Sequence, residues 1–233
     1  MGWIILLYAG FASVFTFSKV ALSVSEPFFL IGSRMMLAGV LLLGYLAIRS
    51  PEKLKLTKSS IKLVVLLGLL NIYLTNAFEF WGLKYLTSFK TCFIYSLSPF
   101  ASALLSYFMF SERMTPKKWL GLIVGFLGFI PLFISQSEDE LKAGSLFNLS
   151  WAELSVTFAA LTSVYGWILL KQLVQEQKVS FLAANGYSMT IGGIFAIIHS
   201  LSTESWTPVP VTDFYIFLGG FTALLFISNL LCY

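Results

Sequence analysis

The chain has 233 residues, of which 58% are hydrophobic and only 11% are charged, with a formal net charge of +4. Because a soluble domain carries roughly 25% charged residues, this composition excludes an ordinary soluble enzyme or binding domain. The positive charges lie mostly in short breaks between apolar runs, as membrane topology requires, so the net charge does not indicate a nucleic-acid partner. Each run is about 20 residues long, which is the length of an α-helix that crosses a ~30 Å hydrocarbon core.

Eight apolar runs are predicted to be membrane-spanning helices. Lipid offers no hydrogen-bond partners to the backbone, and none of the runs alternates as barrel strands do, so we expect an all-α, multi-pass membrane protein. Thr115 and Pro116 are predicted to cap and begin the fifth helix, and Pro99 to loosen the fourth. The predicted spans are 3–23, 27–48, 61–83, 91–110, 119–134, 151–170, 181–199 and 214–233.

Basic residues gather at alternate ends of these spans. With the N-terminus inside, ten Lys and Arg residues fall at cytoplasmic ends, among them Arg49 and Lys171, whereas only Lys84, Lys90 and Lys142 fall outside. Cytoplasmic ends of membrane proteins carry an excess of Lys and Arg. The charge pattern therefore predicts a cytoplasmic N-terminus.

The acidic loop 136–150 is predicted to divide the chain into two halves. Residues 1–135 then form a first repeat of five helices, 136–150 an extracytoplasmic linker, and 151–233 an incomplete second repeat of three helices. Residues 155–171 weakly repeat the small, aromatic and terminal Lys pattern of 11–19. An odd number of spans before the restart inverts the second half, which is a common construction in secondary transporters.

The strongest local signal is residues 96–128, SLSPFASALLSYFMFSERMTPKKWLGLIVGFLG. A span with Ser-Leu-Ser-Pro, then Ser-Glu-Arg-Met-Thr, then a Gly-rich span beginning Trp-Leu-Gly resembles the EamA branch of the drug/metabolite transporter superfamily. Arg34 stands where this family often has an arginine, and the WGLKY stretch at 81–85 resembles the end of its third span. The family has ten spans as two inverted five-span repeats, so the resemblance implies that this chain lacks the last two helices.

The resemblance implies a secondary transporter in the plasma membrane, which we expect to be a bacterial cytoplasmic membrane. Its expected cargo is a small polar or zwitterionic metabolite, amino-acid-like or nucleoside-like, with proton coupling as an option. S-adenosylmethionine is the alternative substrate. A non-transporting truncated protein or assembly partner is the alternative of another class. No span holds a paired catalytic set, so we do not expect an enzyme.

The expected partners are a small-molecule substrate and the lipid bilayer, and a homodimer is left open. We expect no nucleic-acid partner and no cofactor. We also expect no metal site, because the two cysteines stand alone inside apolar runs without metal-ligand spacing.

Three ionisable side chains, Lys19, Arg34 and Glu79, lie well within predicted spans. A charge at the centre of a spanning helix costs roughly 2.5–3.5 kcal/mol on insertion scales, so such residues are functional candidates. A rise of ~1.5 Å per residue places all three in the outer half at similar heights. Either Lys19 and Arg34 bind an anion or carboxylate, with Glu79 as counter-ion or proton acceptor, or the three are structural. In the structural alternative Arg34 and Glu79 form a salt bridge, and Lys19 reaches the outer headgroups.

Polar residues also recur at helical spacing on the third and fourth spans, and two aromatic residues in the sixth are candidate walls for a substrate. Such stripes either line a cavity or hydrogen-bond to neighbouring helices. The aromatic residues alternatively serve packing or the interfacial belt. The predicted substrate-binding residues are Lys19, Arg34, Asn71, Thr75, Glu79, Tyr95, Ser98, Ser102, Tyr165 and Trp167.

Overall fold

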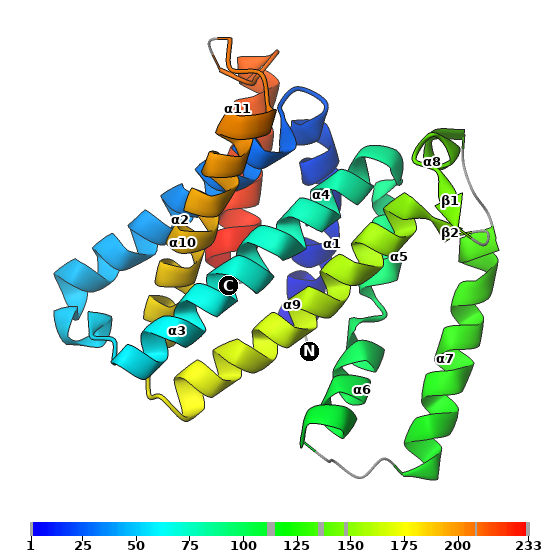
Figure 1. Cartoon of the computed structure of the whole chain (residues 1–233), viewed down its shortest axis with the longest axis horizontal. Helices are drawn as coiled ribbons and strands as arrows, with labels where there is room; N and C mark the ends of the chain where they lie inside the picture. The colour runs from blue at the N-terminus through cyan, green and yellow to red at the C-terminus, as the bar shows by residue number, and fades with distance from the viewer. Residues whose placement is uncertain (1, 111–114, 135–137, 147–148, 208, 232–233) are drawn as a thin grey trace.

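The structure, a computed structural model, describes residues 2–110, 115–134, 138–146, 149–207 and 209–231, and these are nearly all helical (Figure 1). Within them, five helical segments are long and apolar enough to cross a membrane, and two shorter apolar helices cover Ala12–Leu22 and Phe214–Asn229. The chain is therefore a multi-pass membrane protein, as predicted. The five segments are Pro27–Arg49, Lys58–Tyr85, Ser88–Phe108, Trp151–Gln175 and Phe181–Thr203.

Each predicted run is largely helical among the described residues, whereas the number of eight spans stays a prediction. The first half contains α1 (Gly2–Leu22), α2 (Pro27–Arg49), η1 (Pro51–Leu54), α3 (Lys58–Leu67), η2 (Gly68–Leu74), α4 (Thr75–Tyr85), α5 (Ser88–Tyr95), α6 (Ser98–Phe110) and α7 (Pro116–Ile134). The second contains α8 (Glu138–Lys142), β1 (Ser145–Leu146), β2 (Leu149–Ser150), α9 (Trp151–Gln175), α10 (Phe181–Thr203), α11 (Phe214–Leu224) and η3 (Leu225–Leu231).

The linker contains a short antiparallel hairpin, β1–β2, which the all-α prediction did not include. Gly144, which precedes it, has a φ of +81°, a conformation that a glycine adopts without steric penalty. The carbonyl of Gly144 accepts a hydrogen bond of 3.0 Å from the backbone N–H of Trp151, so the hairpin is tied to the start of α9.

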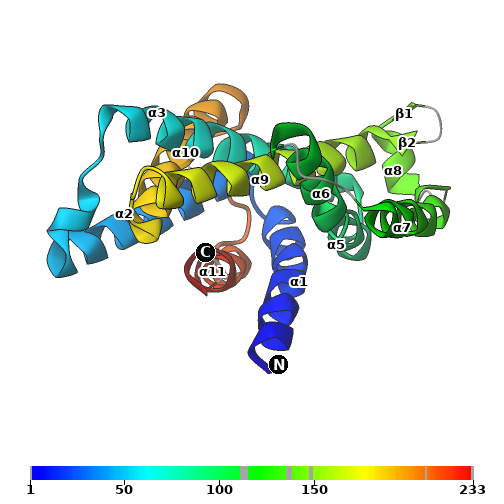
Figure 2. The ribbon, with the colours of Figure 1, turned by 90° about the horizontal axis from the view of Figure 1, so that it is seen from below.

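Helix α2 packs along α10, and the α3–α4 helix packs along α9. Helices α1 and α11 contact each other on one side of this layer (Figure 2). Glycines allow the close approach of α2 and α10: a Cβ on Gly39 would overlap Thr190, and one on Gly193 would overlap Met36. Small residues at such crossings let helix backbones approach in membranes.

The fourth predicted span is broken between α5 and α6. Pro99 has no N–H to donate to the carbonyl of Tyr95, four residues earlier, and the hydroxyl of Ser98 donates to that carbonyl instead at 2.6 Å. The prediction that Pro99 loosens this helix is confirmed. Helix α7 begins at Pro116, directly after Thr115, also as predicted. The Thr115 hydroxyl oxygen accepts a hydrogen bond of 3.4 Å from the backbone N–H of Lys118.

The third span is continuous from Lys58 to Tyr85 but contains the wide π-type turns of η2 in its middle. The backbone N–H of Thr75 donates to the carbonyl of Leu70, five residues back rather than four. A π-type turn accommodates one extra residue, so α4 is rotated relative to a plain continuation of α3 by about 100°, the turn of one helical residue.

The end of α2 at Pro27 is fixed by a side chain from the end of α10. The carboxylate of Glu204 accepts hydrogen bonds from the backbone N–H groups of Phe28 at 2.6 Å and Phe29 at 2.9 Å. The hydroxyl of Ser200 donates to the same carboxylate at 2.6 Å. A negative charge at a helix N-terminus satisfies free N–H groups and the helix dipole, so Glu204 holds α2 in place against α10.

A buried ionic cluster connects the linker to α5 and α9. The ammonium of Lys90 lies 2.6 Å from a carboxylate oxygen of Glu140 and 2.7 Å from one of Glu153. Their side chains are 5%, 3% and 0% exposed. Glu153 also forms a capping box with Ser150 at the start of α9. We call these three residues the Lys90 cluster.

Candidate functional site

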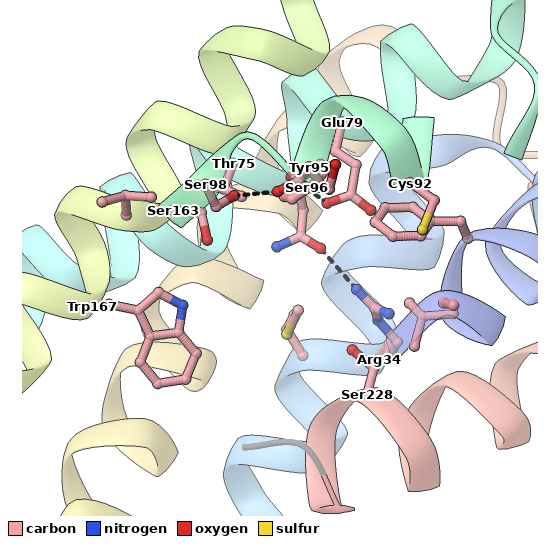
Figure 3. A pocket seen from close by; sticks show the side chains of 16 residues that line it. Arg34, Thr75, Glu79, Cys92, Tyr95, Ser96, Ser98, Ser163, Trp167 and Ser228 are labelled. Atoms are coloured by element: carbon pink, nitrogen blue, oxygen red, sulfur yellow. Dashed lines mark hydrogen bonds between the residues drawn. The ribbon is translucent and has the colours of Figure 1, made fainter. Parts of the chain in front are cut away.

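A cavity of about 340 Å³ lies among six helical elements: α1, α2, α4, the α5–α6 break, α9 and η3 (Figure 3). Its volume falls in the range of roughly 300–1,000 Å³ that small-molecule sites occupy. The polar and sulfur-bearing side chains in its lining are Arg34, Met35, Thr75, Asn76, Glu79, Cys92, Tyr95, Ser96, Ser98, Ser163, Trp167 and Ser228. We call it the central cavity.

Arg34 reaches the central cavity from α2 and is 2% exposed. One guanidinium nitrogen donates to Oδ1 of Asn76 at 2.8 Å, and the group lies 5.4 Å from the centre of the Phe80 ring. The Asn76 amide nitrogen donates to the carbonyl of Ile72 at 2.7 Å, so the amide oxygen is turned towards Arg34. The Asn76 amide oxygen and the Phe80 ring therefore help to hold this cation in the cavity wall.

Glu79 enters the central cavity from α4, where the hydroxyl of Tyr95 donates to its carboxylate at 2.7 Å. The Tyr95 ring packs against Phe15 of α1, with ring centroids 5.2 Å apart. Cys92, one turn before Tyr95 on α5, also lines the central cavity (Figure 3). Among the described residues no ion pair joins Arg34 to Glu79, although both line the cavity, so the salt bridge of the structural alternative is not formed.

A second cavity of about 790 Å³ continues from the central one between α6 and α9. The two share Tyr95, Ser96, Ser98, Val164 and Trp167 in their linings. Beyond these, Ser102 and Ser106 follow Ser98 at four-residue intervals on one face of α6, and Ile168 and Lys171 lie opposite on α9. The combined space thus extends from the centre of the fold towards the last turns of α6 and α9. We call it the serine-lined passage.

Seven of the ten predicted substrate-binding residues line one or both of these spaces. They come from α2, η2–α4, the α5–α6 break and α9, so the fold brings together residues that are far apart in the sequence. The seven are Arg34, Thr75, Glu79, Tyr95, Ser98, Ser102 and Trp167.

Lys19 lies outside both linings and contacts the end of α4 instead. Its ammonium donates to the carbonyl of Leu83 at 3.0 Å and to that of Leu86. The last carbonyls of a helix lack intrahelical partners, and a cation there also interacts favourably with the helix dipole. The position of Lys19 therefore joins α1 to α4.

Asn71 and Tyr165 are also outside both linings. Asn71 packs against Gly166 of α9, where a Cβ would overlap its side chain. Tyr165 packs against an apolar cluster that includes Leu169 and Leu173. Thr75, four residues after Asn71, does line the central cavity, and its hydroxyl lies 2.8 Å from that of Thr162.

Several polar lining residues were not predicted, among them Asn76, Ser96, Ser106, Ser163, Lys171 and Ser228. Asn76 is the partner of Arg34, but the expected α-helical phase placed it beside rather than on the polar stripe. Ser163 lies one turn before Trp167, so its position was available from that spacing. Ser228 comes from η3 at the end of the described chain, where nothing in the sequence distinguished it from a packing serine.

Comparison with known proteins places the chain in a family. Residues 1–134 match the EamA-like transporter family. The chain is 42% identical over 224 residues to a protein of Chlamydia trachomatis (serovar L2) named S-adenosylmethionine/S-adenosylhomocysteine transporter, covering 95% of this chain and 68% of that one. A protein of the same name from Chlamydia muridarum is 40% identical over 95% of this chain and 70% of its own length.

More distant relatives agree with these matches. The uncharacterized transporter YyaM of Bacillus subtilis is 28% identical over 81% of this chain and 61% of its own length. A crystal structure of a protein superposes with a TM-score of 0.61 at 17% identity, covering 94% of this chain and 76% of the other, and supports the fold alone. The match to the family model spans more than half of the chain, and several relatives are transporters by name. The chain belongs to the EamA-like transporter family of the drug/metabolite transporter superfamily, and it is a membrane transporter of a small molecule, not an enzyme.

Proposed function

We propose that this chain is a secondary transporter that moves S-adenosylmethionine and S-adenosylhomocysteine across the plasma membrane. The observation that carries the proposal is the 40–42% identity, over 95% of the chain, to the chlamydial transporters of that name. The sequence alone favoured an amino-acid-like or nucleoside-like metabolite and gave S-adenosylmethionine second. The relatives favour the second choice, which combines an amino acid and a nucleoside in one molecule.

The lining of the two cavities is compatible with such a molecule. A guanidinium such as that of Arg34 binds a carboxylate with two parallel hydrogen bonds, which an ammonium cannot reproduce. The indole of Trp167 belongs to both linings and offers a flat apolar face to an adenine ring. The serine hydroxyl oxygens of the passage can accept hydrogen bonds from ribose and adenine groups, while the hydroxyls of Ser96 and Ser98 donate to carbonyls of their own chain segment.

Uptake by the purified chain in proteoliposomes tests this function. We expect labelled S-adenosylmethionine to enter vesicles preloaded with unlabelled S-adenosylhomocysteine faster than empty vesicles. The Chlamydia trachomatis relative serves as the positive control, and protein-free vesicles as the negative one. Uptake by the relative but not by this chain, with either compound on either side, would contradict the proposal.

We also propose that the N-terminus is cytoplasmic and that 1–135 and 151–233 are inverted repeats. In Figure 1 the α2–α3 and α9–α10 connections lie at the lower end, and the α1–α2, α4–α5 and α10–α11 connections at the upper end. The lower connections carry the Lys and Arg excess of the sequence. Impermeant thiol labelling of Thr57→Cys and Ser145→Cys, without Cys92 and Cys232, tests the orientation. In intact cells only position 145 should react.

Two modes of coupling are compatible with this site. In one, S-adenosylmethionine exchanges for S-adenosylhomocysteine, and no gradient other than those of the substrates is needed. In the other, Glu79 carries a proton, because it is a carboxylate in a cavity within a span. Accumulation in empty vesicles driven by an imposed pH gradient supports proton coupling. Transport that needs an internal substrate and ignores the pH gradient supports exchange.

A further inference from the structure

We infer that Glu79, Tyr95 and Phe15 form a subsite for a permanent organic cation, and that this subsite distinguishes the sulfonium of S-adenosylmethionine from the neutral thioether of S-adenosylhomocysteine. The inference rests on the proposed function and assigns a specificity-determining role to the part of the central cavity around Glu79. Arg34, on another helix, holds the amino-acid group that both compounds share.

The lining of the central cavity carries two opposite charges. Arg34 comes from α2 and Glu79 from α4, and both side chains line the cavity (Figure 3). No ion pair connects Arg34 to Glu79 among the described residues, so their opposite charges border the cavity from two different helices without a direct contact. A ligand that carries a carboxylate and a cation at two places along its length matches this separation.

The surroundings of Glu79 suit a sulfonium better than an ammonium. An ammonium has three N–H donors and needs acceptors for them, whereas a sulfonium has no donor and needs only negative charge and polarisable contacts. The Tyr95 hydroxyl uses its hydrogen on the Glu79 carboxylate, and the Phe15 ring packs on Tyr95 at 5.2 Å between centroids. A carboxylate with aromatic faces beside it is the combination that binds alkylated cations.

The consequence is a difference between the two substrates that depends on one carboxylate. At neutral pH the two compounds carry the same carboxylate and ammonium, and only S-adenosylmethionine adds a fixed positive charge at sulfur. Loss of the charge on Glu79 should therefore weaken the binding of S-adenosylmethionine alone. Loss of the Arg34 guanidinium should weaken the binding of both compounds to a similar extent.

The test compares Glu79→Gln with the wild-type chain and with Glu52→Gln, a matched change of an exposed glutamate in η1. Both compounds compete with labelled S-adenosylhomocysteine for transport, and the wild-type chain is measured first. We expect the inhibition constant of S-adenosylmethionine to rise about tenfold or more in Glu79→Gln, the equivalent of losing one charged interaction, and that of S-adenosylhomocysteine to change less than about threefold. Glu52→Gln should change neither.

A second measurement does not depend on transport by the variant. Cys92 lines the same cavity as Glu79, so its labelling rate reports the electrostatic field in that cavity. In a chain carrying Cys232→Ser, a trimethylammonium methanethiosulfonate should label Cys92 faster than the sulfonatoethyl reagent. Like a sulfonium, the trimethylammonium group is a permanent cation without N–H donors. Glu79→Gln should remove that preference, and Glu79→Asp, which keeps the charge, should retain it.

The outcomes separate this inference from the function on which it rests. If the wild-type chain transports both compounds but Glu79→Gln raises both inhibition constants equally, the subsite assignment is wrong and the function stands. The same holds if wild-type Cys92 shows no preference for the cationic reagent. If the wild-type chain transports neither compound while the Chlamydia trachomatis relative does, the function fails and the subsite assignment fails with it.

Discussion

The molecule buries charges in two regions that are built differently. In the Lys90 cluster, one ammonium lies within 2.7 Å of two carboxylates, and all three side chains are at most 5% exposed. In the central cavity, Arg34 and Glu79 are held by a neutral amide and a phenol, at 2.8 and 2.7 Å, and no ion pair joins them. The cluster brings its opposite charges together, whereas the cavity keeps them apart.

The difference separates structural from functional charges. Buried charges that are already in direct contact with opposite charges have little left to offer a ligand, and removing one partner leaves an uncompensated buried charge. Charges that are oriented by neutral partners and border a cavity can interact with a ligand of opposite charge. We therefore expect changes in the Lys90 cluster to affect folding and changes in the cavity to affect transport.

The largest effect is expected for Lys90→Met, which leaves Glu140 and Glu153 buried next to each other without their cation. Removing one partner of a buried pair destabilises a protein by about 3–5 kcal/mol. Thermal unfolding in detergent measures this loss. The control is Lys84→Met, because Lys84 lies 3.6 Å from Glu26 in a pair that is 40% and 46% exposed, worth about 0–1 kcal/mol. Equal melting temperatures for the two variants would show that the cluster is not structural.

The next effect is expected for Arg34→Lys, and it should appear in transport rather than in stability. A lysine keeps the positive charge and can still donate to Asn76, but it loses the bidentate fork for a carboxylate. Uptake of both substrates at low concentration should fall about tenfold, and Arg34→Ala should abolish it. Membrane levels and melting temperature are measured in parallel. A loss of folded protein as large as in Lys90→Met would make Arg34 a structural cation.

A smaller effect is expected for Tyr95→Phe, which keeps the ring but removes the hydroxyl that donates to Glu79 at 2.7 Å. One hydrogen bond to a charged group holds that group in position, so the KM for S-adenosylmethionine should rise about fivefold while that for S-adenosylhomocysteine stays unchanged. Tyr107→Phe is the matched control, because Tyr107 on α6 is outside both linings. A similar rise for both substrates would leave Tyr95 without a part in their discrimination.

The smallest effect is expected for Asp139→Asn in the same linker as Glu140. The Lys142 ammonium, 2.6 Å away, lowers the pKa of the exposed Asp139 carboxyl. A lowered folded-state pKa adds stability above the unfolded value of about 3.9, and this stability is lost as the pH falls through the folded value. Because the pair is exposed and screened by solvent, this added stability is small, and wild type and Asp139→Asn should melt at the same temperature to within error at pH 7. A drop as large as for Lys90→Met would remove the contrast between exposed and buried pairs.

Much of the fold could be predicted because the relevant signals are local. Apolar runs of spanning length predicted the helices. Pro99 predicted the break between α5 and α6, and Thr115 with Pro116 predicted the start of α7. The pairing within the Lys90 cluster could not be predicted, because Glu140 is 50 residues from Lys90 and only the folded chain brings them together. The sequence assigned both residues to the outer side without identifying their contact.

The candidate site was less predictable because depth in a span does not determine the direction of a side chain. Lys19 is at the expected height, but its side chain contacts the end of α4. Tyr165 and Trp167 are two residues apart on α9, about 200° around the helix, so both cannot face one cavity. Trp167 lines it, and Tyr165 packs on the opposite side.

The wide turns of η2 have a consequence for aligning this chain with its relatives. The extra residue that they accommodate shifts every later position on the helix relative to the turns before, and Thr75 and Glu79 line the central cavity while Asn71 does not. A relative that forms the same helix without wide turns would present the same cavity face with one residue fewer. Alignments between the two kinds of protein should carry a single-residue gap within 68–74. An ungapped alignment would match Glu79 to a position about 100° around the helix from the one that faces the cavity.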